Sequence, residues 1–389
     1  RFGESNIKGG SVVQGYGNQN GRFGNSFFGE GAGDMYVQRF AVDLSDMVPF
    51  DLVVGRIGAY TDNPYIYKHS DNTPYFDNSR WDNPEWLMDG AIASFKAGNG
   101  KVRVFGGNQG ELSSNHGVQI QPIGSEVNSF FNRVLGIDAA FGIGTNGKLN
   151  LAYVNNFTKG TSSYDRLEVF GGGVEFGLSN DLNIAIGYSQ STQKLVGSTV
   201  LNSDEDNTAI YGDITYRQDN WGFAGGLRRI EQNYFGLGGW DRIGTDWAPV
   251  NIQDIKLSGW TKFGNGSVLK GTYLFGDTIE NNVAPGFYNA DYSSLILSLE
   301  HELWSGWKAT LGYENVDIDI DRGTSEALAT RFNVTQKWYT LGLSTAMSAN
   351  NLFKLTYQYG DVKNDLNWGV AGRGNYKGHI LTSQISIKF

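Results

Sequence analysis

Apolar and polar residues alternate along several segments of the chain, as they do in a β-strand whose two faces meet different surroundings. The segments 182–189, 354–359 and 382–389 show this most clearly, with apolar residues at every second position and one exception at Ser383. Segments of this kind, each roughly 10 to 14 residues long, follow one another through nearly the whole chain. The pattern predicts an all-β protein.

Short polar turns join these segments in pairs. Asn-Gly, Gly-Asn and Asp-Asn pairs supply the positive φ angles that tight hairpins require. We expect the turns at 45–49, 97–100, 145–147, 179–181, 218–220, 264–266, 304–306 and 348–350. Longer connections are expected at 62–85, 110–130, 194–206, 233–249, 279–290, 320–329 and 364–374, with a tighter one near 159–163. Short and long connections therefore alternate.

That alternation is typical of a closed antiparallel transmembrane β-barrel, which has short periplasmic turns at one end and long extracellular loops at the other. Counting segments gives about 18 strands between Asn6 and Phe389, or about 16 if the Gly-rich stretch before Asp34 contributes none. No linker separates two cores, so the sequence predicts one barrel domain over 1–389. A soluble β-sandwich or propeller is the alternative, and it predicts solubility without detergent.

The composition supports this reading and excludes several functions. The chain has 54 Gly, 7 Pro and 14% aromatic residues, a mixture that suits strands and turns. The net charge of −9 argues against nucleic-acid binding, which requires a basic surface. Without Cys there are no disulfides or thiolate metal ligands. Because residues 1–10 lack a charged segment followed by an apolar one, we expect no signal peptide in this sequence.

Aromatic residues gather near the expected strand ends, where amphipathic rings form the two interfacial girdles of a membrane barrel. Ordinary cross-strand packing is the alternative explanation. The residues are Trp221, Phe223, Phe263, Trp304, Trp307, Tyr313, Tyr339, Phe353, Tyr357 and Tyr359.

The last segment, 379–389, ends in Phe389 after apolar residues at Leu381, Ile385 and Ile387. It resembles the closing strand of bacterial outer-membrane β-barrel proteins, in which a terminal Phe is the signal read by the barrel-assembly machinery. Segments 36–42, 53–58 and 88–91 more loosely resemble early strands of porins that carry an S-layer-homology domain, although no such domain is present in this sequence.

This resemblance implies an outer-membrane porin, surrounded by lipid and lipopolysaccharide and assembled as a homotrimer. Its function would be passive diffusion of ions and small hydrophilic solutes through a charged aqueous pore. A structural or attachment barrel with a narrow or plugged lumen is one alternative, and a saccharide-selective porin is another.

Charged residues at expected inward positions are candidates for the pore wall, because fixed charges keep such a wall hydrated. Arg39, Arg56 and Arg103 would form one wall of a constriction on neighbouring strands, with Asp89 between them. Mutual pairing on a wet interior surface explains the same charges equally well. The remaining candidates are Asp138, Glu111, Glu126 and Arg228. The net charge favours a mild cation preference, whereas the arginines favour anions locally.

The long connections 62–85 and 110–130 are candidates for folding into the lumen. Aromatic residues in 62–85 would either stack on sugar rings, giving saccharide selectivity, or pack the loop onto the barrel.

Asp317, Asp319 and Asp321 share one strand face and predict an acidic cation-attracting patch or a weak calcium site near a pore mouth, or else a solvated strand end. We expect no other cofactor. The sequence lacks a Gly-x-Ser-x-Gly elbow and a His-Glu-x-x-His motif, so it predicts no enzyme.

Overall fold

The computed structural model describes residues 6–9, 13–15, 35–44, 49–58, 66, 87–109, 133–157, 164–195, 205–234, 242–243, 246–247, 251–279, 289–304, 306–321, 332–348, 351–364 and 376–387. Within these ranges every regular element is a β-strand, which confirms the all-β prediction. No helix in these ranges has the length and apolar character needed to cross a membrane.

The strands of the first half are mostly 8 to 14 residues long, and those near the C-terminal end reach 17. In chain order they are β1 (Asn6–Gly9), β2 (Val13–Gly15), β3 (Met35–Asp43), β4 (Asp51–Gly58), β5 (Leu87–Ala97), β6 (Gly100–Gln109), β7 (Arg133–Ile143), β8 (Gly147–Phe157), β9 (Tyr164–Gly177), β10 (Leu182–Leu195), β11 (Thr208–Arg217), β12 (Trp221–Ile230), β13 (Arg242–Ile243), β14 (Asp246–Trp247), β15 (Ile252–Lys262), β16 (Val268–Thr278), β17 (Asn289–Trp304), β18 (Trp307–Asp321), β19 (Phe332–Ser348), β20 (Asn351–Asn364) and β21 (Tyr376–Ile387).

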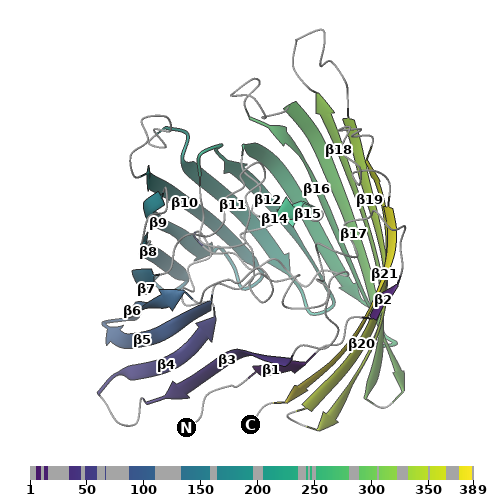
Figure 1. Ribbon diagram of the computed structural model, residues 1–389, viewed down its shortest axis with the longest axis horizontal. Helices are drawn as coiled ribbons and strands as arrows, with labels where there is room; N and C mark the ends of the chain where they lie inside the picture. The colour runs from purple at the N-terminus through teal and green to yellow at the C-terminus, as the bar shows by residue number, and fades with distance from the viewer. Residues whose placement is uncertain are drawn as a thin grey trace.

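The strands form one antiparallel meander. From β3 to β21 each strand pairs with its neighbours in sequence, except that β12 pairs directly with β15 and the short β13 and β14 form their own hairpin. At the two ends of this series, β1 pairs with β3 and β2 pairs with β21. The sheet curves strongly, so that β3 and β1 come round towards the side of β20 and β21 (Figure 1).

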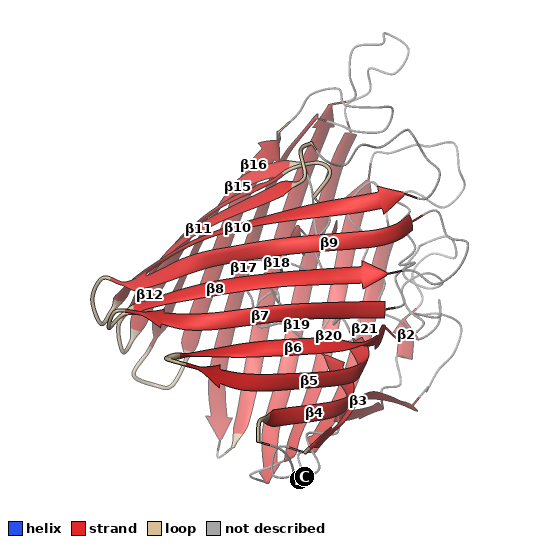
Figure 2. Cartoon of the chain, turned by 90° about the vertical axis from the view of Figure 1, so that its left-hand side faces the viewer, coloured by secondary structure: helices blue, strands red, loops and turns tan. Residues whose placement is uncertain are grey.

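The connections alternate as the sequence predicts. Two residues, Gly98 and Asn99, join β5 to β6, and comparably short turns join β7 to β8, β9 to β10 and β11 to β12. The long connections fall between β4 and β5, β6 and β7, and the later pairs in the same order. Figure 2 shows the short turns of β5 to β10 gathered along one edge of the sheet. Gly98 has a φ of 59°, the left-handed conformation that this tight turn requires.

The ladder register divides the strand residues between two faces. Cross-strand partners lie on the same face of a sheet. Ser94, Arg103 and Asp138 are successive partners on β5, β6 and β7, and we call the face on which they lie the inner face. The other, the outer face, carries large apolar side chains that remain exposed, from Val54 on β4 to Leu381 on β21. Exposure on this face reaches 55% for Leu135 and 62% for Leu227. A soluble protein rarely exposes so extensive an apolar surface.

Aromatic rings lie on the outer face at two levels, one beside the short turns, as expected, and one that on β18 and β19 lies midway along the strands. Near the short turns, the Trp307 ring lies 6.2 Å from Trp304 and 6.5 Å from Phe353. Farther towards the long connections, a row of rings crosses β18 to β21, with centroids 5.0 to 6.0 Å apart. This row consists of Tyr313, Tyr339, Tyr359 and His379. The arrangement matches two interfacial girdles.

Candidate pore wall

Arg103 on β6 and Asp138 on β7 form an ion pair on the inner face. Their Cα atoms are cross-strand partners, so the two side chains meet without any distortion of the sheet. The Arg103 Nε donates to Asp138 Oδ1 at 2.8 Å and its Nη2 donates to Oδ2 at 2.6 Å. The fork geometry is that of a strong arginine–carboxylate pair. Both residues were sequence candidates for the pore wall, and the structure brings them together.

A second and more deeply buried pair joins Arg228 on β12 to Asp254 on β15. The Arg228 Nε lies 3.1 Å from Oδ1 and 3.0 Å from Oδ2, and the Nη2 also donates to Oδ2. Only 6% of the arginine side chain and 2% of the aspartate side chain are exposed. Arg228 was a candidate from the sequence, whereas its pairing with Asp254 depends on a register that the sequence does not state.

Tyr292 on β17 completes this cluster from two strands away. The register places Gly276 of β16 between Asp254 and Tyr292. Because Gly276 has no side chain, the phenol reaches across it and donates to Asp254 Oδ2 at 2.9 Å. Sequence reasoning missed Tyr292; the only available signal was its inner-face parity beside a glycine on the neighbouring strand.

The predicted arginine wall is not assembled as expected. The register from β3 to β6 places Asp43 on the same inner face as Arg103. Arg39 is four residues before Asp43 on β3, so its backbone position is on the inner face as well. Arg56 and Asp89 are cross-strand partners, but they occupy register positions on the outer face. The prediction extended the alternation into β4 and β5 without their register, and a one-residue change of phase reverses the face. Glu111, Glu126 and Phe389 lie outside the described residues.

The inner face is buried and largely apolar towards the long connections. Its residues there belong to a single buried cluster: Met88, Val134, Val154, Leu167, Val169, Ala209, Ile230, Ile252, Leu274 and Val316. Two residues from long connections complete the cluster, Ile66 between β4 and β5 and Tyr234 between β12 and β15. Apolar residues at inner-face positions are stable when other apolar groups cover them.

Ile66 and Tyr234 lie against the wall formed by β9 and β10. A Cβ atom at Gly171 of β9 would lie 2.0 Å from Ile66 Cγ2, so this close contact requires glycine. The Ser189 hydroxyl of β10 donates to the Tyr234 hydroxyl at 2.7 Å. Burial raises the pKa of Tyr234, which therefore stays protonated. Ile66 thus lies where an inward fold of 62–85 would place it; the connection 110–130 is outside the described residues.

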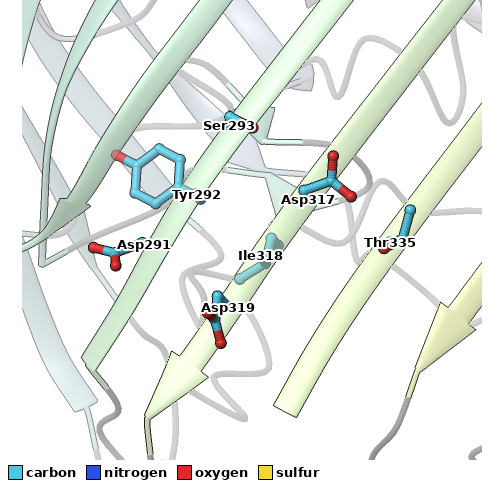
Figure 3. Close-up of a pocket in the computed structure, with 7 residues that line it drawn as sticks. All are labelled: Asp291, Tyr292, Ser293, Asp317, Ile318, Asp319 and Thr335. Atoms are coloured by element: carbon cyan, nitrogen blue, oxygen red, sulfur yellow. The ribbon is translucent and has the colours of Figure 1, made fainter. Parts of the chain in front are cut away.

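The three aspartates of β18 lie at the end of the strand nearest the long connections. Asp317 and Asp319 share the parity of Tyr313 and therefore lie on the outer face, as does the backbone position of Asp321. Asp319 is the cross-strand partner of Asp291, and both border a depression of about 460 Å³ (Figure 3). The described residues contain no group of three potential metal ligands. The register therefore places these carboxylates outside the lumen rather than at its mouth.

No family model matches the sequence, and no curated protein matches it. Among solved structures, an anion-selective porin from Comamonas acidovorans has a TM-score of 0.48 at 10% identity, covering 100% of this chain and 99% of its own. The outer-membrane channel DcaP of Acinetobacter baumannii has a TM-score of 0.47 at 9% identity, with 99% and 96% covered. This chain is similar to outer-membrane channels. OccK5 (OpdH) of Pseudomonas aeruginosa has a TM-score of 0.49 at 11% identity, with 99% and 98% covered.

Proposed function

We propose that the protein is a porin of the bacterial outer membrane, through which ions and small hydrophilic solutes diffuse passively. One observation carries the proposal: exposed apolar residues occupy the outer face from β4 to β21, whereas the two buried arginine–aspartate pairs, Arg103–Asp138 and Arg228–Asp254, lie on the inner face. A sheet with an apolar outside and a charged inside is stable when it closes on itself in a bilayer, because closure leaves no unpaired edge in lipid.

The two short N-terminal strands support closure of the sheet into a barrel. Only three residues separate Gly9, the end of β1, from Val13, the start of β2. β1 pairs antiparallel with β3, β2 pairs antiparallel with β21, and Cα atoms of β1 also come within 8 Å of β21. We infer that β1 and β2 are two parts of one strand that joins the ends of the meander. With this strand, the barrel has about 18 strands in one domain over 1–389, an even number typical of such barrels.

The buried cluster around Ile66 and Tyr234 narrows the lumen on the side of the long connections. A narrowed lumen supports solute filtering in a porin, since an ordinary 16- to 18-stranded barrel otherwise leaves a wide aqueous channel. The same cluster favours a second function, an envelope anchor with a plugged lumen. Conductance measurements distinguish the porin from the anchor, because a plugged lumen passes no current.

The environment and assembly of the protein are proposals of the same kind. The apolar band and its aromatic borders fit outer-membrane lipid and lipopolysaccharide, with the long connections outside the cell. Phe389 is proposed as the signal for the barrel-assembly machinery, and a homotrimer as the assembled state. A weak calcium site at Asp317, Asp319 and Asp321 would lie on the outer rim and take no part in the pore.

The test is conductance of the detergent-purified protein in a planar bilayer. The porin proposal predicts stable, stepwise and ohmic conductance. A folded, heat-modifiable barrel that gives no steps would overturn the porin and support the anchor.

A further inference from the structure

Seven basic residues of the inner face cluster at the short-turn end of the strands. Each lies beside a short turn or within three residues of one, and each is exposed. We call them the basic collar: Lys96, Lys101, Lys148, Arg217, Lys262, Lys270 and Lys308. In a barrel with long loops outside the cell, this end is the periplasmic mouth of the lumen.

The register fixes the direction in which the collar faces. Lys96 and Lys101 are cross-strand partners, two residues from Ser94 and Arg103 on the same face. Lys148 and Glu175 are partners on β8 and β9, and they follow the inner-face parity of Ala152. In the second half of the meander, Lys270 is the cross-strand partner of Trp260 on β15. Trp260 lies six residues after Asp254 on the same strand, so Lys270 shares the inner face with Asp254. These side chains therefore belong to the charged face rather than to the apolar one.

Carboxylates at this end neutralise the collar only in part. Among the described strand residues, five carboxylates occupy inner-face positions at this end, against the seven basic residues: Asp43, Asp51, Glu175, Glu300 and Glu302. Lys101 lies 3.9 Å from Asp51, with 54% of its side chain exposed. Lys270 lies 2.7 Å from Glu300 and is likewise 54% exposed. Each of these pairs cancels one positive charge, but the seven basic residues outnumber the five carboxylates, so the collar keeps an excess of two positive charges.

Deeper in the lumen the basic residues are compensated. Arg103 and Arg228 are each paired with a buried aspartate, so these two pairs contribute little net field. Much of the acidity responsible for the net charge of −9 lies elsewhere, for example at Asp291, Asp317 and Asp319 on the outer face. The net charge of the chain is therefore a poor guide to the charge that a solute meets.

We propose that the basic collar makes the pore prefer small anions over cations. The proposal rests on the porin function proposed above, and it specifies the solute class of that pore. Neighbouring strands are only about 4.8 Å apart, and charges separated by less than the Debye length of about 10 Å at 0.1 M salt act together. A mouth of one charge sign raises the local concentration of counter-ions.

The test is the reversal potential of single channels under a potassium chloride gradient. The wild-type pore is expected to pass chloride about two to five times more readily than potassium, with the preference increasing as salt is diluted. The collar variant replaces Lys96, Lys148, Lys262 and Lys308 with Gln. Its permeability ratio is expected to fall to about 1 or below.

A matched control removes the same number of positive charges from the outer face. It replaces Arg133, Arg229, Lys337 and Lys363 with Gln and is expected to retain the wild-type ratio, because these residues do not face the lumen. Heat-modifiability verifies folding of each variant. If the fourfold collar variant does not fold, Lys148→Gln and Lys308→Gln are measured singly, and each is expected to lower the ratio in part.

The outcomes separate this inference from the proposed function. Stepwise conductance with a cation preference, or a collar variant whose selectivity equals that of the control, would overturn the anion proposal and leave the porin intact. An absence of conductance in the wild-type protein would overturn both.

Discussion

The Arg228, Asp254 and Tyr292 cluster gives the sharpest energetic prediction. Replacing Asp254 with Ala removes both carboxylate oxygens to which the Arg228 guanidinium donates, while the guanidinium stays buried. Only 6% of the Arg228 side chain is exposed, so water cannot replace the lost carboxylate without disrupting the wall. Breaking a buried pair by removing one partner costs about 3–5 kcal/mol. We expect Asp254→Ala to lower the free energy of unfolding by this amount.

Two further substitutions show whether the loss of stability in Asp254→Ala comes from burial of the ion pair. Tyr292→Phe removes one hydrogen bond to a charged acceptor and is expected to cost about 1.5–3 kcal/mol. Glu300→Gln breaks the Lys270 pair, in which both side chains are more than a third exposed, and is expected to cost less than about 1 kcal/mol. The expected order of destabilisation is therefore Asp254→Ala, then Tyr292→Phe, then Glu300→Gln.

The assay is reversible urea unfolding of the refolded protein in lipid vesicles, followed by the fluorescence of its 10 tryptophans. Linear extrapolation then gives the free energy of unfolding for each variant. If Asp254→Ala were no more destabilising than Glu300→Gln, the pair would be solvated in the membrane-inserted protein and the reasoning from burial would be refuted.

Three further predictions test other parts of the structure. Gly171→Ala should displace Ile66 and increase single-channel conductance, and unchanged conductance would show that Ile66 does not narrow the lumen. Leu151→Arg places a charge midway along the outer face of β8, among lipid chains, and should cost about 2–4 kcal/mol in vesicle unfolding, whereas a neutral effect would contradict its outer-face position. Val13→Cys with Leu381→Cys should form an intramolecular disulfide on oxidation, because the two residues are cross-strand partners; failure to cross-link would argue against closure through β2.

The order of strands and connections was predictable because it depends on local signals. Turn residues such as Gly98 and Asn99 mark hairpins through their own backbone preferences. Two-residue alternation, as at Leu182 and Ile184, marks strands in the same way. These signals survive in a single sequence, and each predicted short turn between described strands is confirmed by the pairing around it.

Which residues face the lumen was less predictable, because this depends on how each strand is aligned with its neighbours. Arg103 and Asp138 were both recognised, but Arg56 and Asp89 were assigned to the inner face and occupy the outer one. The turn lengths that set this alignment are known only to within a residue from sequence, and one residue is enough to reverse a face. Tyr292 was missed for a related reason, since its partner lies two strands away across Gly276.

The central claim, that successive residues of one strand face lipid and a water-filled lumen in turn, can be tested on β17. The chain has no cysteine, so single cysteines can be placed at consecutive positions from Leu297 to Glu300 without altering native thiols. We predict that a charged, water-soluble thiol reagent modifies positions 298 and 300 and reduces conductance, while fluorophores at 297 and 299 are quenched by nitroxide lipids. Equal modification and equal quenching at all four positions would contradict the claim.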